Sequence, residues 1–176
     1  HLYWVWDGFE IGRLQKNIGS VSGVALSPDG KLVLTWSDGP YPAQLWKVPN
    51  FESVAILDIQ GVTAAAFNQD GTSIVLAGNT AIGVYDVASG ELKKISSDTY
   101  FEVEGISFSP TRTFSQGQRL AVLYQSGAIT NWAIDGQSPL FVRPDYPTSS
   151  IMYLPEPYGI AAGTTEKTVL LLDDED

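Results

Sequence analysis

The sequence predicts an all-β fold built from repeated modules of about 40 residues, because two separate series of residues recur with that period. The first series stands 41, 41 and 45 residues apart, at Leu26, Phe67, Phe108 and Tyr153. The second stands 40, 39, 47 and 39 residues apart, at Trp6, Trp46, Tyr85, Trp132 and Leu171. Between the two series, short runs alternate apolar and polar residues, which is typical of β-strands.

Each module is predicted to contain about four antiparallel strands, called a to d in chain order. Strand a is expected at 21–27, 62–67, 103–109 and 150–154, and strand b at 31–36, 72–77, 119–124 and 158–162. Strand c is expected at 43–48, 81–87, 128–134 and 167–172. Strand d is the more polar run that follows, for example 52–57 and 91–96, as suits an outer edge facing solvent. Near the N-terminus, a strand c at 2–7 and a strand d at 9–15 are expected. No stretch keeps the apolar spacing of a helix.

Turn residues separate these strands. Residues 28–30 and 69–71 each end in a glycine that can take the left-handed conformation of a hairpin turn. We expect the carboxylates of Asp29 and Asp70 to accept backbone hydrogen bonds in these turns and not to act as an acid/base pair. One tryptophan in each of three modules is expected to be buried between neighbouring modules: Trp6, Trp46 and Trp132.

The chain resembles the WD-repeat β-propellers over essentially its whole length. The resemblance rests on Leu-Ser-Pro-Asp-Gly at 26–30, Phe-Ser-Pro at 108–110, Gln-Leu-Trp-Lys at 44–47, Gly-Val-Tyr-Asp-Val-Ala-Ser-Gly-Glu-Leu at 83–92 and Trp-Val-Trp-Asp-Gly at 4–8. It implies that each module is one propeller blade. The family's Gly-His between strands d and a is missing from every module, since His1 is the only histidine. The Ser/His/Asp/Trp network that the family buries in each blade is therefore incomplete, and we expect packing to hold the blades together.

The chain is predicted to be a single β-propeller region, 1–176. Residues 1–16 would end one blade, 17–58, 59–97 and 98–143 would form three blades, and 144–176 would form an incomplete one. The expected strands number 17, which fits neither four nor five blades of four strands. We therefore expect a segment of a larger propeller, whose remaining blades would be partners of this chain. The alternative is a small propeller that its own termini close.

Composition limits the classes of partner. The 176 residues include 10 basic and 20 acidic side chains, and the net charge of −10 repels nucleic-acid phosphates. The absence of cysteine excludes disulfides and thiol chemistry. The sequence has no long apolar run, signal peptide or lipidation motif. We expect a soluble protein without nucleic-acid or membrane partners; the residues leave its compartment open, with the cytoplasm slightly favoured.

The residues predict neither catalysis nor a metal nor a cofactor. A single histidine at the first position cannot serve a Ser/His/Asp triad, and no Cys, His or carboxylate cluster has the spacing of zinc ligands. Glycine-rich motifs for nucleotide binding are also absent. An enzyme built on a propeller would need charged side chains converging from several strands a, where Glu102 and Glu104 are the only nearby carboxylates.

The candidate binding residues lie in or beside the loops between strands b and c and between strands d and a. The family's strand order implies that both kinds of loop open on one face. The candidates are Trp36, Asp38, Tyr41, Tyr100, Phe101, Tyr124, Asp145 and Tyr146. Rigid aromatic rings flanked by carboxylates suit a protein or peptide partner. Ordered turns without a partner are the alternative.

These observations predict a non-catalytic protein–protein interaction scaffold. Two other functions remain open: a sensor or regulatory module of a larger multidomain protein and, from a different class, a propeller-based enzyme.

Overall fold

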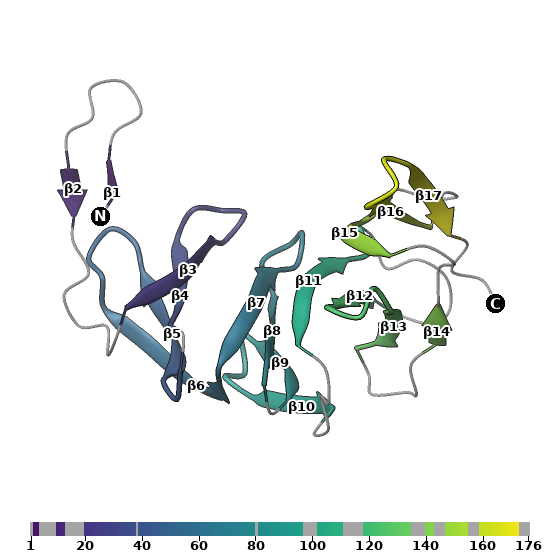
Figure 1. Ribbon diagram of the computed structural model, residues 1–176. Coiled ribbons are helices and arrows are strands. Elements are labelled where there is room, and N and C mark those ends of the chain that lie inside the picture. Colours follow the sequence, from purple (N-terminus) through teal and green to yellow (C-terminus); the bar gives the residue numbers. More distant parts are fainter. Residues whose placement is uncertain are drawn as a thin grey trace.

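The computed structural model describes residues 2–3, 10–12, 20–37, 39–79, 81–96, 102–110, 118–134, 140–142, 147–154 and 159–172 (Figure 1). Within these residues the chain forms 17 strands, joined by turns, and no helix. None of this part of the chain is therefore a helix long and apolar enough to cross a membrane.

The strands form five antiparallel sheets in which chain neighbours are paired. The first four-stranded sheet holds β3 (Val21–Leu26), β4 (Leu32–Ser37), β5 (Pro42–Lys47) and β6 (Ser53–Gln60). The second holds β7 (Val62–Phe67), β8 (Ser73–Gly78), β9 (Ile82–Asp86) and β10 (Leu92–Ser96). The third holds β11 (Val103–Phe108), β12 (Arg119–Tyr124), β13 (Ile129–Ala133) and β14 (Leu140–Val142). The fourth has three strands, β15 (Thr148–Tyr153), β16 (Ile160–Thr164) and β17 (Val169–Leu172). A separate pair consists of β1 (Leu2–Tyr3) and β2 (Glu10–Gly12).

Strands a, b and c lie close to their expected positions because the alternation of apolar residues predicts them well. Strand d of the first sheet differs from the expected polar edge. It extends to Gln60, and its Leu57 and Ile59 are buried against the second sheet. Of the strands expected at 2–7 and 9–15, the structure describes only β1 and β2, and the remaining residues lie outside the described part.

The sheets stand side by side in a row, with strand a of each sheet next to strand a of its neighbours (Figure 1). β3 contacts β7, β7 contacts β11 and β11 contacts β15. The first and the fourth sheet lie at opposite ends of this row. We call the face of a sheet that points to the following sheet its forward face, and the face that points to the preceding sheet its rear face.

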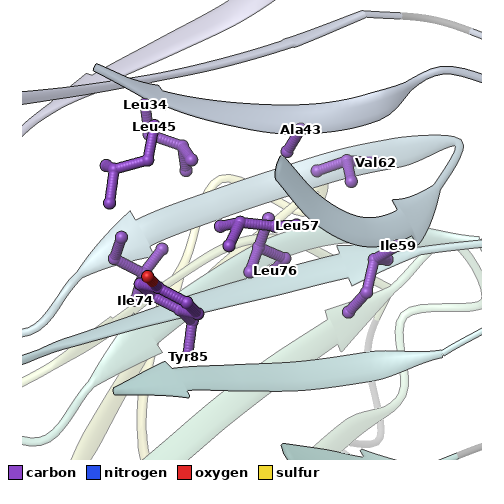
Figure 2. Packing of buried hydrophobic residues seen from close by; sticks show 9 residues of the cluster. All are labelled: Leu34, Ala43, Leu45, Leu57, Ile59, Val62, Ile74, Leu76 and Tyr85. Carbon is purple, nitrogen blue, oxygen red and sulfur yellow. The ribbon is translucent and has the colours of Figure 1, made fainter. Parts of the chain in front are cut away.

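The core consists of forward faces packed on rear faces. Figure 2 shows the first interface, where Leu34 and Leu45 of the first sheet pack near Ile74, Leu76 and Tyr85 of the second. The second interface joins Val75, Ala77, Ile82 and Val84 to Leu120, Val122 and Tyr124. The third joins Ala121, Leu123 and Ile129 to Tyr153, Ile160 and Ala162. Packing of apolar faces thus connects successive sheets, as expected from the incomplete network.

Strand pairing corrects one member of the second residue series. Trp46 pairs with Val33 and Trp132 pairs with Leu120, and the corresponding partner of Ile160 is Leu172. Leu172, not Leu171, therefore occupies the series position in the fourth sheet. A shift of one residue in a strand reverses the face, so Leu172 packs against the third sheet whereas Leu171 is 66% exposed.

Candidate functional site

The turns between strands b and c meet the connections into strands a at one end of the sheets. In three sheets the N–H of the first turn residue donates to the carbonyl oxygen just before strand a. These bonds run from Asn79 to Gly61 at 3.2 Å, from Gln125 to Glu102 at 2.8 Å and from Thr165 to Pro147 at 3.0 Å. The N–H of Gly61 also donates to the carbonyl of Gly39 at 3.0 Å, which links the first sheet to the second. We call this end the rim, defined by residues 39–41, 61, 79, 102, 125–128, 147 and 165–168.

Every strand a shifts its pairing with strand b at its second residue, next to the rim. The shift lies at the same place in β3, β7, β11 and β15. The residues that the strand register skips are all polar and exposed: Ser22, Thr63, Glu104 and Ser149. Such a β-bulge removes one residue from the ladder and redirects its side chain, commonly beside a binding site. The rim is thus bordered by one exposed polar side chain from each of the four main sheets.

Two of the bulge side chains are held against their own sheets. The hydroxyl of Thr63 donates to the carbonyl oxygen of Ala77 at 3.4 Å, and that of Ser149 donates to the carbonyl oxygen of Gly163 at 3.3 Å. Glu104 supplies the one formal charge among the four positions. Its exposed carboxylate is therefore the strongest polar feature of the bulge series.

Tyr41 is the exposed aromatic residue of the described rim. It is 38% exposed and stands between Pro40 and Pro42, which limit the backbone freedom of the turn. The turn is further fixed by the hydrogen bond from Gly61 to Gly39. A tyrosine on a rigid turn offers a large contact surface at small entropic cost.

Two other predicted site residues lie mostly in the core. Trp36 is half-buried, packs against the cluster between the first and second sheets, and lies over Gly23 of the adjacent strand. Tyr124 is 8% exposed and belongs to the cluster between the second and third sheets. The Thr130 hydroxyl donates to the Tyr124 hydroxyl at 3.3 Å. Little of the Tyr124 ring is left for a partner to contact.

Five predicted site residues lie outside the described part of the chain: Asp38, Tyr100, Phe101, Asp145 and Tyr146. Their place in a binding face stays a prediction. In the sequence, Phe101 directly precedes Glu102 and Tyr146 directly precedes Pro147, and both of these neighbours belong to the rim.

The sequence interpretation did not identify the bulge series. A signal was present, because each bulge residue stands four positions before a member of the first residue series. Ser22 precedes Leu26 and Thr63 precedes Phe67 by this offset, and the same holds for Glu104 and Ser149. A polar residue repeated at one offset in four successive strands a is a detectable pattern.

The carboxylates at the end of the sheets opposite the rim accept hydrogen bonds within the turns. Oδ1 of Asp29 accepts hydrogen bonds from the Ser27 hydroxyl at 2.7 Å and the Lys31 N–H at 3.0 Å, and Oδ1 of Asp70 accepts one from the Thr72 N–H at 2.9 Å. The expected turn role of Asp29 and Asp70 is confirmed. Glycines 30 and 71 have the expected left-handed backbone, with φ of 71° and 73°.

Hydrogen bonding also lowers carboxyl pKa values at this end. The Ser27 hydroxyl, followed by the Lys31 N–H, lowers the pKa of Asp29 to about 2. The Ser89 N–H lowers the pKa of Asp86. Among the residues that the structure describes, no three or more His, Cys, Asp or Glu side chains gather as metal ligands would.

No protein-family model and no curated protein matches the chain. Among solved structures, the chain is similar to the WD40 domain of SCAP from fission yeast, with a TM-score of 0.63 and 16% sequence identity. The similarity covers 89% of this chain and 39% of that one, so the chain spans about two fifths of that structure's length. It confirms the predicted fold: the antiparallel sheets are blades of a WD40-type β-propeller. At this identity the similarity shows the fold alone.

Proposed function

We propose that this chain is a non-catalytic protein-interaction module whose partner binds the rim. The observation that carries the proposal is the bulge series, which repeats an exposed polar side chain beside the rim in four successive sheets. A series with a constant place in each blade can provide a partner with several aligned contacts. WD40 propellers generally bind proteins, which favours a protein partner over a small molecule.

The rim is also well ordered for binding. Backbone hydrogen bonds tie its turns to the starts of strands a, so that a partner meets a surface whose conformation is already fixed. Tyr41 supplies an exposed aromatic ring, a residue type that often dominates interface energetics. The candidates Tyr100 and Phe101 would extend the aromatic surface from the neighbouring connection.

The charge of the described rim indicates what charge the partner's surface should carry. Glu102 and Glu166 are exposed on it, Glu104 lies beside it, and Lys167 is its one basic side chain within the described residues. The whole chain carries a net charge of −10. We infer that the partner presents a basic or neutral surface and that association slows as salt rises.

A photo-crosslinking amino acid at position 63 or 104, and at position 69 at the opposite end, would first identify the partner. We expect the same protein to be crosslinked from 63 and from 104 but not from 69. Binding of Tyr41→Ala, Tyr100→Ala and Phe101→Ala variants, singly and combined, then tests the anchors. We expect an anchor to contribute about 2 kcal/mol, which is a loss of roughly 30-fold in affinity.

Glu104→Lys provides a charge test with a matched control. Glu91 is exposed in the turn between β9 and β10 at the opposite end, so Glu91→Lys makes the same change in net charge away from the rim. We expect Glu104→Lys to weaken binding by about tenfold and Glu91→Lys to leave it within about twofold. Equal losses, or crosslinking from position 69 alone, would exclude the rim as the binding surface.

A further inference from the structure

Glu104 lies in the middle of a row of three bulge residues, between Thr63 and Ser149. The three hold the same register position on the strands a of the second, third and fourth sheets, and β11, which carries Glu104, contacts both β7 and β15. All three residues are exposed. The second and third sheets each have a described sheet on both sides, so the exposure of Thr63 and Glu104 does not arise at an end of the row of sheets (Figure 1).

Close packing holds β7, β11 and β15 together beside this row. Val103, next to Glu104, is buried in one cluster with Ala64 of β7. On the other side of Glu104, a Cβ added at Gly105 would lie 3.8 Å from Cγ1 of Ile151 of β15. Both contacts lie one or two residues from the bulges of the three strands, so the bulge side chains share one small area of the surface.

The polar atoms of the row accept hydrogen bonds and have no proton left to donate. The Thr63 hydroxyl already donates its proton to the carbonyl oxygen of Ala77, and the Ser149 hydroxyl donates to that of Gly163. Each hydroxyl oxygen keeps lone pairs that can accept a further hydrogen bond. The carboxylate of Glu104 is an acceptor only. The row therefore places acceptors on both sides of a negative charge, which suits a ligand with a positive charge and several N–H donors.

Within its described part, the chain does not supply that cation. Among these residues no basic side chain forms an ion pair with Glu104, whereas Lys31 lies 3.2 Å from Asp29 at the opposite end of the sheets. A cationic group from outside the chain can therefore bind Glu104 without displacing a described partner.

We propose that Thr63, Glu104 and Ser149 bind a basic side chain, lysine or arginine, of the partner. This site rests on the proposed function, since it names the group of the partner that the rim recognises. The ammonium or guanidinium group pairs with the Glu104 carboxylate, and its other N–H groups donate to the two hydroxyl oxygens. Such a charged contact fixes the orientation of the partner on the rim, because a neutral side chain cannot replace it.

Short peptides of defined sequence test the site before the partner is known. The probes are acetyl-Gly-Arg-Gly-amide, acetyl-Gly-Lys-Gly-amide and acetyl-Gly-citrulline-Gly-amide, in which citrulline keeps the shape of arginine and carries no charge. In NMR titrations of the isotope-labelled chain, we expect at least one basic peptide to bind with a Kd of about 1–10 mM. The amide signals of residues 63, 104 and 149 should shift, and the citrulline peptide should bind about tenfold more weakly or not at all.

Substitutions in the row assign the contacts. Glu104→Gln, which keeps the shape and removes the charge, should weaken binding of the basic peptide by about tenfold. Thr63→Val and Ser149→Ala each remove one hydroxyl acceptor and should weaken it by about threefold. Glu91→Gln removes a charge at the opposite end of the sheets and should leave the Kd within about twofold. Thermal melts establish that each variant is folded.

Three outcomes would overturn this proposal: neither basic peptide binds, the citrulline peptide binds as tightly as the arginine peptide, or folded Glu104→Gln binds the basic peptide unchanged. None of the three would refute the rim as the binding surface, which crosslinking of the whole partner from positions 63 and 104 tests separately. Conversely, crosslinking from position 69 alone would refute the rim as the partner's surface and with it the assignment of the basic side chain to that partner.

Discussion

The indole Nε1 of Trp46 on β5 donates a 2.9 Å hydrogen bond to Oγ1 of Thr35 on the adjacent strand β4. Both residues are buried. In the third sheet the Trp132 indole also donates to a threonine, Thr130, at 2.8 Å, but that residue lies on the same strand. This tryptophan–threonine bond connects the two central strands of the first sheet.

We predict that Trp46→Ala lowers the free energy of unfolding by roughly 3–5 kcal/mol, because a fully buried large ring is lost and a cavity remains. Thr35→Val, which removes the hydroxyl that accepts this bond and keeps the buried ring, should cost about 1 kcal/mol. Trp132 is half-buried, so Trp132→Ala should cost less than Trp46→Ala. Urea titrations of the three variants measure these differences. A loss below about 1 kcal/mol for Trp46→Ala would place its ring outside the core.

We predict that Gly23→Ala is destabilising whereas Gly105→Ala is tolerated. The two glycines occupy the same position in β3 and β11. A Cβ at Gly23 would overlap the ring of Trp36, whereas a Cβ at Gly105 would meet no atom closer than 3.8 Å. Displacing the indole should cost roughly 1–3 kcal/mol. Denaturant melts give the cost, and a changed Trp36 environment should appear in fluorescence. Equal stability of the two variants would contradict the packing of Trp36 on Gly23.

We predict an energetic coupling between Tyr153 and Asn131, which join the fourth sheet to the third. The Tyr153 hydroxyl donates to Oδ1 of Asn131 at 2.6 Å, and the Nδ2 of Asn131 is buried without a partner. Tyr153→Phe should cost about 1–3 kcal/mol, because it leaves the whole buried amide unpaired. Asn131→Leu introduces a leucine, the residue that Leu45 provides at the corresponding position of the first sheet. In the Asn131→Leu background, Tyr153→Phe should lower the free energy of unfolding much less than in the unmodified chain.

A double-mutant cycle measured by chemical denaturation determines this coupling. The control is Tyr153→Phe combined with Thr35→Val, a pair in separate sheets whose effects should add. If Tyr153→Phe costs the same in the unmodified chain and in the Asn131→Leu background, the hydrogen bond does not contribute to the interface.

The sequence predicted most of the fold because repeats and alternation are local signals. Strand positions in the four main sheets followed from apolar residues at every second position and from turn glycines such as Gly30 and Gly71. The extension of β6 did not follow, because burial of Leu57 and Ile59 depends on the second sheet. Leu171 was assigned to the wrong face of its strand, because alternation in a short strand does not show which of the two faces packs against a neighbouring sheet.

The candidate site was less predictable because it depends on contacts between sheets. Trp36 and Tyr124 are amphipathic residues at the ends of strands, and sequence alone cannot tell whether such a ring contacts a partner or the next blade. In this fold Gly23 leaves space for the Trp36 ring, and Thr130 binds the Tyr124 hydroxyl. The bulge series, in contrast, is encoded at a constant offset and is detectable once its position is known.

We predict that Asp29 titrates well below an ordinary aspartate and that Ser27 is the main cause. The Ser27 hydroxyl and the Lys31 N–H stabilise the carboxylate, so the pKa falls from 3.8 to about 2. Because the folded pKa lies below the unfolded value, the turn is stabilised above about pH 4, and this contribution is lost as the pH falls toward 2. Side-chain carboxyl titration by NMR should give a midpoint near 2. Ser27→Ala should raise it toward 3.8 and leave Asp86, whose pKa Ser89 lowers, unchanged. An Asp29 midpoint that does not respond to Ser27→Ala would refute the assigned cause.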